Sequence, residues 1–322
     1  RHAKTDCGRR FLFRCQRNRV VESFMALTTT KATAVGLLAP ALWAMSVGLV
    51  RTVTVEAGIA GGVCLMNLIA AALLMCVFGF PKFSDYPKKY LAFGLTAALL
   101  CELCFPISMG LCRTSRETIE VGMVNYAWPC LTVLFAILFN GQTSRRWVVI
   151  GLIVAFTGMA MVLSGDGGLH PAEIAANVGK NPTPYILAFT GAVAWAAYCS
   201  ITRGIGIKKN PVVLIFLGNT LVYGTLYSMG FGERFVFSFD AVKACLIAGC
   251  VMASGYAVWN IGIISGRMTV LAIASYFTPV LSCLFASMYL NQPLTLSFFK
   301  GVGLVVAGSL VCWAATRRGK AV

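Results

Sequence analysis

Residues 126–158, YAWPCLTVLFAILFNGQTSRRWVVIGLIVAFTG, recur 150 residues later as residues 276–308, YFTPVLSCLFASMYLNQPLTLSFFKGVGLVVAG. Nine of the 33 positions are identical, whereas the apolar bias of the chain would give only a few. The identities are Tyr126, Pro129, Leu131, Leu134, Phe135, Ala136, Gln142, Gly151 and Gly158 in the first copy, and Tyr276, Pro279, Leu281, Leu284, Phe285, Ala286, Gln292, Gly301 and Gly308 in the second. A weaker repeat lies upstream, where Trp43, Ala44 and Arg51 recur as Trp195, Ala196 and Arg203 at an offset of 152. The repeats predict a chain built from two similar halves.

The hydrophobic segments are long enough to cross a membrane. Hydrophobic residues make up 58% of the chain and charged residues only 12%, and about 20 consecutive apolar residues span a bilayer as a helix. Ten such segments can be marked: 33–50, 59–79, 90–110, 119–139, 147–163, 184–202, 211–230, 243–262, 268–290 and 297–315. The linkers are short, and the longest, 164–183, reads as an ordinary polar loop. We therefore predict an all-α integral membrane protein with ten transmembrane helices.

The basic residues behind the net charge of +16 are distributed unequally between the two sides of the membrane. If the N-terminus is cytoplasmic, the cytoplasmic segments hold 20 of the 27 Lys and Arg residues. The positive-inside rule then places both termini in the cytoplasm. The basic excess is thus explained without a nucleic-acid partner, and the lipid bilayer is the expected surrounding.

The duplication divides the chain into domains. We expect a first five-helix repeat at 29–164, a loop at 165–183 and a second five-helix repeat at 184–319. Because five is odd, the second repeat enters the membrane from the opposite side, and the two inverted repeats surround a central cavity, as in several secondary transporters. Residues 1–28 are basic and irregular and start without Met, so we expect a disordered segment that is an upstream start or a non-native addition.

Two matched prolines lie at the centres of their spans, Pro129 in the fourth and Pro279 in the ninth. Proline has no amide N–H, so the carbonyls of Asn125 and Ser275 lose their usual helical partners. In lipid, such carbonyls are tolerated only against protein or a polar cavity. A pair of them at the midplane suits an ammonium group, although each proline could simply kink its helix.

Glu102 is the only acidic residue deep inside a span. Carboxylates in this position usually face the bundle interior and serve function. Three roles are open: a ligand for a substrate amine, a proton carrier, or a neutral group that hydrogen-bonds neighbouring helices.

Aromatic side chains near the middle of the spans complete the predicted site. Trp and Tyr normally gather at the membrane interfaces, but Tyr126, Trp128, Trp195 and Tyr276 lie near mid-span. Buried indole and phenol groups need polar partners, which favours a cavity over ordinary helix packing. The candidate substrate-binding residues are Glu102, Asn125, Tyr126, Trp128, Trp195, Tyr198 and Tyr276.

The predicted spans hold few residues that could act in catalysis or bind a metal. Cys101 and Cys104 form a CxxC pair, but the only histidines are His2 and His170, outside the spans. We expect no metal, no cofactor and no disulfide. An intramembrane enzyme would need a nucleophile–base or metal constellation, so we expect no catalytic residues. No nucleotide-binding motif is present, so ATP-driven transport by this chain alone is not expected.

The stretch EVGMVNYAWPCLTVLFAILFNGQ at 120–142, with WAAYC at 195–199 and SYFTPVLS at 275–282, strongly resembles the YddG-type aromatic amino-acid exporters. These belong to the EamA branch of the drug/metabolite transporter superfamily, and the resemblance covers about residues 29–319. It implies an inner-membrane exporter of aromatic and other neutral amino acids that works by alternating access.

The resemblance also assigns residues. The family's cavity aromatics correspond to Tyr126, Trp128 and Trp195, and Cys101 stands where relatives carry Tyr, which implies a wider pocket on that side.

An exporter of drugs or other small metabolites is the alternative within the same class. The expected partner is a small-molecule substrate, namely a neutral and especially an aromatic amino acid, and the expected state is a monomer. Proton antiport and facilitated diffusion are both open.

Overall fold

The computed structural model describes residues 28–141, 146–164, 169–205, 207 and 210–317, and within these ranges the regular structure is entirely helical. The expected disordered segment at 1–28 lies outside the described residues except for Thr28. The prediction of an all-α chain is confirmed.

The α-helices follow one another with short connections. Their bounds are α2 Thr29–Gly36, α3 Leu38–Ala44, α4 Ser46–Glu56, α5 Val63–Phe78, α6 Thr96–Leu111, α7 Ser115–Asn125, α8 Trp128–Asn140, α9 Trp147–Ser164, α10 Pro171–Lys180, α11 Pro182–Ile205, α12 Val212–Ser228, α13 Phe239–Ser265, α14 Met268–Ser275, α15 Thr278–Tyr289 and α16 Leu296–Arg317. The π-helical segments Gly58–Gly62 and Tyr90–Leu95 lead into α5 and α6, and a short 3₁₀ turn spans Phe83–Asp85.

Seven helical segments in the described part of the chain are long and apolar enough to cross a membrane. They are Gly58–Phe78, Tyr90–Leu111, Ser115–Asn140, Trp147–Ser164, Pro182–Ile205, Phe239–Trp259 and Leu296–Ala315. A further pair, Thr29–Ala44 and Ser46–Glu56, meets the same criteria together but bends by 44°. Val212–Ser228 and Thr278–Tyr289 are apolar but shorter. The chain is therefore a membrane protein built from hydrophobic helices.

The predicted loop at 165–183 contains a helix, so that prediction is wrong for most of its length. Residues Pro171–Lys180 form α10. Proline is favourable at the start of a helix, where its missing N–H has no partner to lose. Glu173 in the first turn and Lys180 in the last turn complement the helix dipole. These local signals outweigh the polar composition of the segment.

Regular helix is interrupted at equivalent places in the two copies of the sequence repeat. α7 ends at Asn125 and α8 begins at Trp128, so Tyr126 and Ala127 lie outside regular helix. In the second repeat, α14 ends at Ser275 and α15 begins at Thr278. Pro129 and Pro279 are then in the first turn of the following helix, where proline is well tolerated. The matched prolines thus follow short turns that interrupt the regular α-helix.

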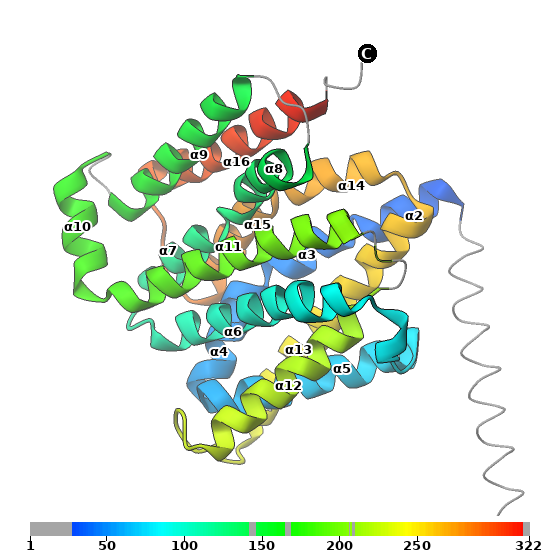
Figure 1. Ribbon diagram of the computed structural model, residues 1–322. Helices are drawn as coiled ribbons and strands as arrows, with labels where there is room; N and C mark the ends of the chain where they lie inside the picture. Colours follow the sequence, from blue (N-terminus) through cyan, green and yellow to red (C-terminus); the bar gives the residue numbers. More distant parts are fainter. Residues whose placement is uncertain (1–27, 142–145, 165–168, 206, 208–209, 318–322) are drawn as a thin grey trace, which may run out of the picture.

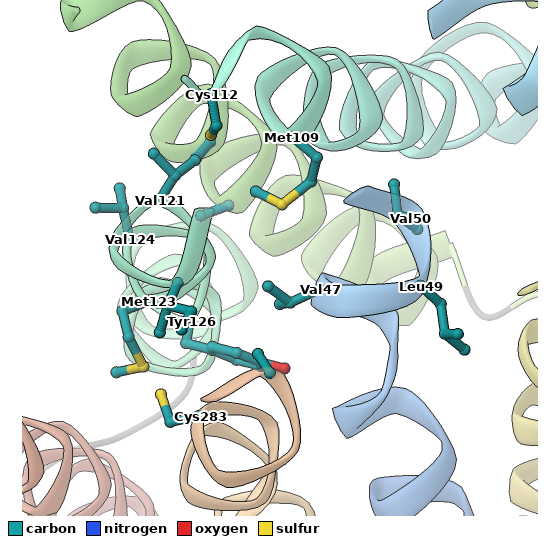
Figure 2. Packing of buried hydrophobic residues seen from close by; sticks show 14 of the residues in the cluster. Val47, Leu49, Val50, Met109, Cys112, Val121, Met123, Val124, Tyr126 and Cys283 are labelled. Carbon is teal, nitrogen blue, oxygen red and sulfur yellow. The ribbon is translucent and has the colours of Figure 1, made fainter. Parts of the chain in front are cut away.

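The helices form one bundle in which α9 and α16 lie side by side at one edge (Figure 1). α6 packs on α11, α5 packs on α12, and α13 packs on α2, α3 and α4. A core of buried side chains fills the space between α4, α6, α7 and α15. Figure 2 shows this core around Val47, Met109, Val121 and Cys283, which are all nearly inaccessible.

The contact between α9 and α16 depends on four repeated glycines. A Cβ atom at Gly158 would lie 2.5 Å from the carbonyl oxygen of Gly301, and one at Gly308 would lie 2.5 Å from that of Gly151. Small residues let membrane helices approach until their backbones touch, and this close packing drives their association. Any larger side chain here would push the two helices apart.

Replacing Gly301 by Ala should therefore destabilise the fold, since a Cβ there lies 2.7 Å from the backbone oxygen of Gly158. Overpacking of this kind costs about 1–3 kcal/mol. Gly303→Ala is the matched control, because it lies two residues along the same helix and nothing is within 4 Å of its Cβ position. Thermal unfolding of the purified variants in detergent should show a lower Tm for Gly301→Ala alone. Equal Tm values would show that the helices can separate at no cost.

Candidate functional site

A cavity of about 250 Å³ lies where the helix pairs α7–α8 and α14–α15 meet α3, α4, α6, α11 and α13. Its lining residues come from both halves of the sequence. They are Trp43, Ser46, Cys101, Glu102, Phe105, Asn125, Tyr126, Trp128, Trp195, Cys199, Met252, Tyr256, Trp259, Ser275 and Thr278. An apolar pocket with a few polar groups is the usual form of a small-molecule site.

Aromatic rings form two walls of this cavity. On one side, the Trp43 ring lies 5.4 Å from the Tyr256 ring and 5.0 Å from the Trp259 ring, measured between centroids. On the other side, Trp128 and Trp195 meet edge to face at 6.5 Å. These separations and angles are those of attractive aromatic pairs. The repeated tryptophans of the sequence, Trp43 and Trp195, thus contribute one ring to each wall.

Glu102 supplies the only charged side chain among the described lining residues. One carboxylate oxygen accepts a hydrogen bond from the Tyr256 hydroxyl at 3.4 Å. Tyr256 also packs edge to face on Phe216 of α12, so its ring is held in place from behind. The cavity therefore combines a large aromatic surface with one acidic group, which suits a cationic or zwitterionic ligand.

Proline 106 determines how the backbone at Glu102 is held. Pro106 lies inside α6, and it cannot donate to the carbonyl four residues earlier, which is that of Glu102. The hydroxyl of Tyr223, on α12, donates to this carbonyl at 3.1 Å and to that of Leu103 at 2.9 Å. Tyr223 is completely buried. A side chain of the second repeat thereby fixes the position of the acidic residue in the first.

The helix breaks bring matched residues into the cavity. Asn125 and Ser275 end α7 and α14, while Trp128 and Thr278 begin α8 and α15, and all four line the cavity. In a continuous helix, the donors to the Asn125 and Ser275 carbonyls would be residues 129 and 279, and both are proline. The breaks therefore lie against the cavity, the one environment besides protein in which lipid-embedded irregular backbone is tolerated.

Five of the seven substrate-binding candidates taken from the sequence line this cavity: Glu102, Asn125, Tyr126, Trp128 and Trp195. The other two, Tyr198 and Tyr276, do not. Tyr198 is buried in a cluster with Tyr86 and Tyr90, and its ring packs against Trp195 at 4.8 Å. Trp195 and Cys199, four residues apart on one face of α11, both line the cavity, whereas Tyr198 packs into the neighbouring tyrosine cluster. Tyr276, although the repeat equivalent of Tyr126, lies outside the lining.

Several lining residues were absent from the predicted set. Only some of them carry a signal in the sequence from which they could have been predicted. Trp43 could have been found through its repeat relation to Trp195, and Thr278 and Ser275 through theirs to Trp128 and Asn125. Phe105, Cys199 and Met252 carry no such signal, since apolar residues abound in every span.

Comparison with known proteins places the chain among membrane transporters. It is 42% identical over 293 residues to the aromatic amino acid exporter YddG of Escherichia coli strain K12, and 40% identical over 292 residues to the protein of the same name in Salmonella typhimurium. Each match covers 91% of this chain and 100% of the relative. The chain belongs to the EamA-like transporter family.

The EamA-like transporter pattern itself matches residues 182–314, which is close to the second repeat. A protein of known crystal structure resembles this EamA-like transporter with a TM-score of 0.60, at 20% identity, over 91% of this chain and 100% of the other. The helical bundle is thus a fold already observed by crystallography.

The contact between Tyr223 and the kink of α6 can be tested by a double-mutant cycle. Tyr223→Phe leaves buried carbonyls without a donor, a loss of about 1–3 kcal/mol. Pro106→Ala restores the N–H that Glu102 lacks, so Tyr223→Phe should cost less in the Pro106→Ala background. The Tm values of the four proteins give the coupling. Additive effects would mean that Tyr223 does not serve the carbonyl freed by Pro106.

Proposed function

We propose that this chain is a secondary transporter that exports aromatic and other neutral amino acids from the cytoplasm by alternating access. The observation that carries the proposal is its similarity, at 40–42% identity, to exporters of aromatic amino acids whose entire length it covers. Because these relatives are transporters, we propose transport rather than catalysis.

The chemistry of the cavity supports this substrate class. The ammonium group of an amino acid would lie near the carboxylate of Glu102, the charged group among the described lining residues. An aromatic side chain would lie between the wall of Trp43 and the wall of Trp128 and Trp195. No Lys, Arg or His is among the described lining residues, so an acidic solute would find no counter-charge. Cys101 at the lining leaves room for varied neutral side chains.

We further propose that the described helices make up ten spans in two inverted five-helix repeats. Such repeats are related by a two-fold axis in the membrane plane. The glycines of α9 and α16 support this arrangement. In the repeat, Gly151 corresponds to Gly301 and Gly158 to Gly308, yet in space Gly151 meets Gly308 and Gly158 meets Gly301. Exchange of partners in this way is the mark of a two-fold, self-complementary contact.

The other helix pairs obey the same relation. α6 packs on α11, and the equivalent pairing, α13 on α2 to α4, is also present. Likewise α11 packs on α7 and α8, while α3 and α4 pack on α15. The helices α5 and α12 are equivalent to each other in the two repeats, and they pack together. In this scheme the bent pair α2/α3–α4 is the first span, α12 the seventh, and α14 with α15 the ninth.

The remaining features of the proposal concern the membrane. The excess of Lys and Arg on one side of the ten-span arrangement supports an inner-membrane protein with both termini in the cytoplasm. The cavity lies within a single chain, so a monomer would suffice for transport.

Uptake by proteoliposomes tests the function. We expect saturable, time-dependent transport of labelled Phe, Trp, Thr or Met. Trp128→Ala and Trp195→Ala should lower the transport rate at least tenfold, because each variant removes an aromatic ring that contacts the substrate. Trp147→Ala is the control, because Trp147 is 58% exposed and outside the cavity. Absence of saturable transport of all four amino acids would refute the proposal, and unchanged rates in a folded variant would remove that tryptophan from the site.

The role of Glu102 can be measured separately. A hydrogen bond to a charged group contributes about 1.5–3 kcal/mol, so Glu102→Gln should weaken competition by Phe roughly tenfold or more. Competition by 3-phenylpropionate, which lacks the amine, should change little. Equal losses for both compounds would show that Glu102 does not recognise the ammonium group. The same liposomes, with and without a pH gradient, report on a proton-carrying role, which unchanged gradient dependence in Glu102→Gln would exclude.

A further inference from the structure

A second cavity, of about 440 Å³, lies where the start of α7 and the start of α11 meet the end of α10. α10 lies at one edge of the bundle, next to the start of α11 (Figure 1). By the proposed orientation this is the outer face, so we call this space the outer cavity and the one around Glu102 the central cavity. The described lining residues of the outer cavity are mostly polar or charged: Arg113, Thr114, Arg116, Glu117, Glu120, Asn177, Lys180, Asn181 and Tyr185.

Glu120, the buried carboxylate of the outer cavity, is occupied by its neighbours. One of its oxygens accepts a hydrogen bond from the Tyr185 hydroxyl at 2.9 Å, and the other accepts one from Nε of Arg116 at 3.1 Å. Removing a carboxylate from water is costly unless such partners replace the water. The guanidinium group of Arg116 therefore neutralises Glu120.

Glu117 is held in a similar way, and it fixes the rim of the outer cavity. Its oxygens accept hydrogen bonds from the backbone N–H of Arg113 and, at 2.8 Å, from the side-chain amide of Asn181. The Asn181 amide also donates to the backbone oxygen of Leu111 at 3.0 Å. These bonds tie the residue that follows α10 to the start of α7, so the walls of the cavity are in place without a ligand.

Two cations of the outer cavity have donors available for a ligand. Arg113 donates to the backbone oxygen of Lys180 at 3.2 Å, which uses only part of a guanidinium group with five N–H donors. The ammonium group of Lys180 forms no ion pair with any described residue. The described lining holds three cations and two carboxylates, so one positive charge there lacks a counter-charge. The outer cavity therefore suits an anionic group.

The outer and central cavities complement each other in charge. The central cavity has the carboxylate of Glu102 but no Lys, Arg or His among its described lining residues, so it offers no counter-charge to the carboxylate of an amino acid. Arg113 and Lys180 offer that counter-charge in the outer cavity. The proposed topology leaves seven of the 27 Lys and Arg residues on the outer side, and three of these seven line this one cavity. Basic residues are scarce on that side of membrane proteins, so their concentration here indicates a use.

Both cavities lie along the same pair of packed helices, α7 and α11. α7 contributes Glu120 to the outer cavity and Asn125 to the central one, while α11 contributes Tyr185 and Trp195. The ten residues from Tyr185 to Trp195 span about 15 Å. All the residues that α11 buries between these two are Ala or Gly. A molecule leaving the central cavity outward along α7 and α11 would therefore reach the outer cavity.

We infer that the outer cavity is a second binding site of this chain, which holds the carboxylate group of a neutral amino acid through Arg113 and Lys180. The central cavity recognises the ammonium group at Glu102, and the outer cavity recognises the opposite end of the molecule nearer the outer face. The inference rests on the proposed function for the choice of an amino acid as ligand. Tyr185 is the one aromatic residue in the described lining, so the outer cavity should not select among neutral side chains.

Three related compounds test the site. Phenylalanine carries both charged groups, N-acetylphenylalanine keeps only the carboxylate, and phenylalaninamide keeps only the ammonium group. The protein is the full chain in phosphatidylcholine nanodiscs, with Trp128→Ala to weaken the central cavity. Titrations followed by ligand-observed NMR should show that both carboxylates bind at least fivefold more tightly than phenylalaninamide. Equal affinities for all three compounds would overturn the inference.

Lys180→Gln is the main variant, because it removes a charge and leaves in place the backbone oxygen to which Arg113 donates. Both side chains are exposed, so Lys180→Gln should weaken the binding of N-acetylphenylalanine about two- to fivefold. The double variant Arg113→Gln/Lys180→Gln should weaken it about tenfold. Arg234→Gln is the matched control, since Arg234 is an exposed cation of an outer loop that lines neither cavity. If N-acetylphenylalanine binds the parent and Lys180→Gln equally well, the inference is wrong.

Other anions are separated by the same measurements. If phosphatidylglycerol in the nanodiscs raises the Tm of the parent but not of Lys180→Gln, and neither carboxylate binds, the cavity holds a lipid phosphate and the inference is wrong. It is also wrong if inorganic phosphate competes as strongly as N-acetylphenylalanine. The titrations need no transport. Lys180-dependent binding in a chain that exports no amino acid would refute the proposed function alone, whereas export without such binding would refute the outer site alone.

Discussion

In the hydrocarbon core of a bilayer there is no water, so each backbone N–H and C=O must find a partner in the protein or border a polar cavity. This constraint shapes the chain around Pro129 and Pro279, which remove two helical donors near the middle of the bundle. The helices break just before both prolines, and the last residue of each broken helix, Asn125 and Ser275, lines the cavity. The cavity therefore borders the places where the backbone departs from regular helix.

The third proline shows the other way to meet the constraint. Pro106 frees the Glu102 carbonyl inside an unbroken helix, and the Tyr223 hydroxyl satisfies it from the opposite repeat. The result is a rigid support directly behind the single carboxylate of the cavity. Proline can thus lie just after an interruption of the helix or inside an unbroken helix whose freed carbonyl is capped by a side chain, and the chain uses both arrangements.

The repeat accounts for the scaffold, while departures from it account for the cavity. Glycine pairs of α9 and α16 obey the two-fold relation closely. At the centre the two copies differ: Trp128 corresponds to Thr278, and Glu102 to Met252, and all four line the cavity. In the proposed transporter, an inverted repeat would allow opening on either side, whereas recognition of one asymmetric substrate would need unequal walls. The same reasoning separates the two tyrosines, since Tyr126 reaches the cavity and Tyr276 does not.

The sequence by itself determined the helical class, the hydrophobic segments and the duplication, and it singled out five residues that line one cavity, because hydropathy, proline chemistry and residue identity are local properties. It could not determine on which side of α11 Tyr198 would pack, that α10 would form within a polar linker, or that Trp43, Tyr256 and Trp259 would share a wall. Those outcomes depend on how helices distant in sequence rotate against one another, and only tertiary packing sets that rotation.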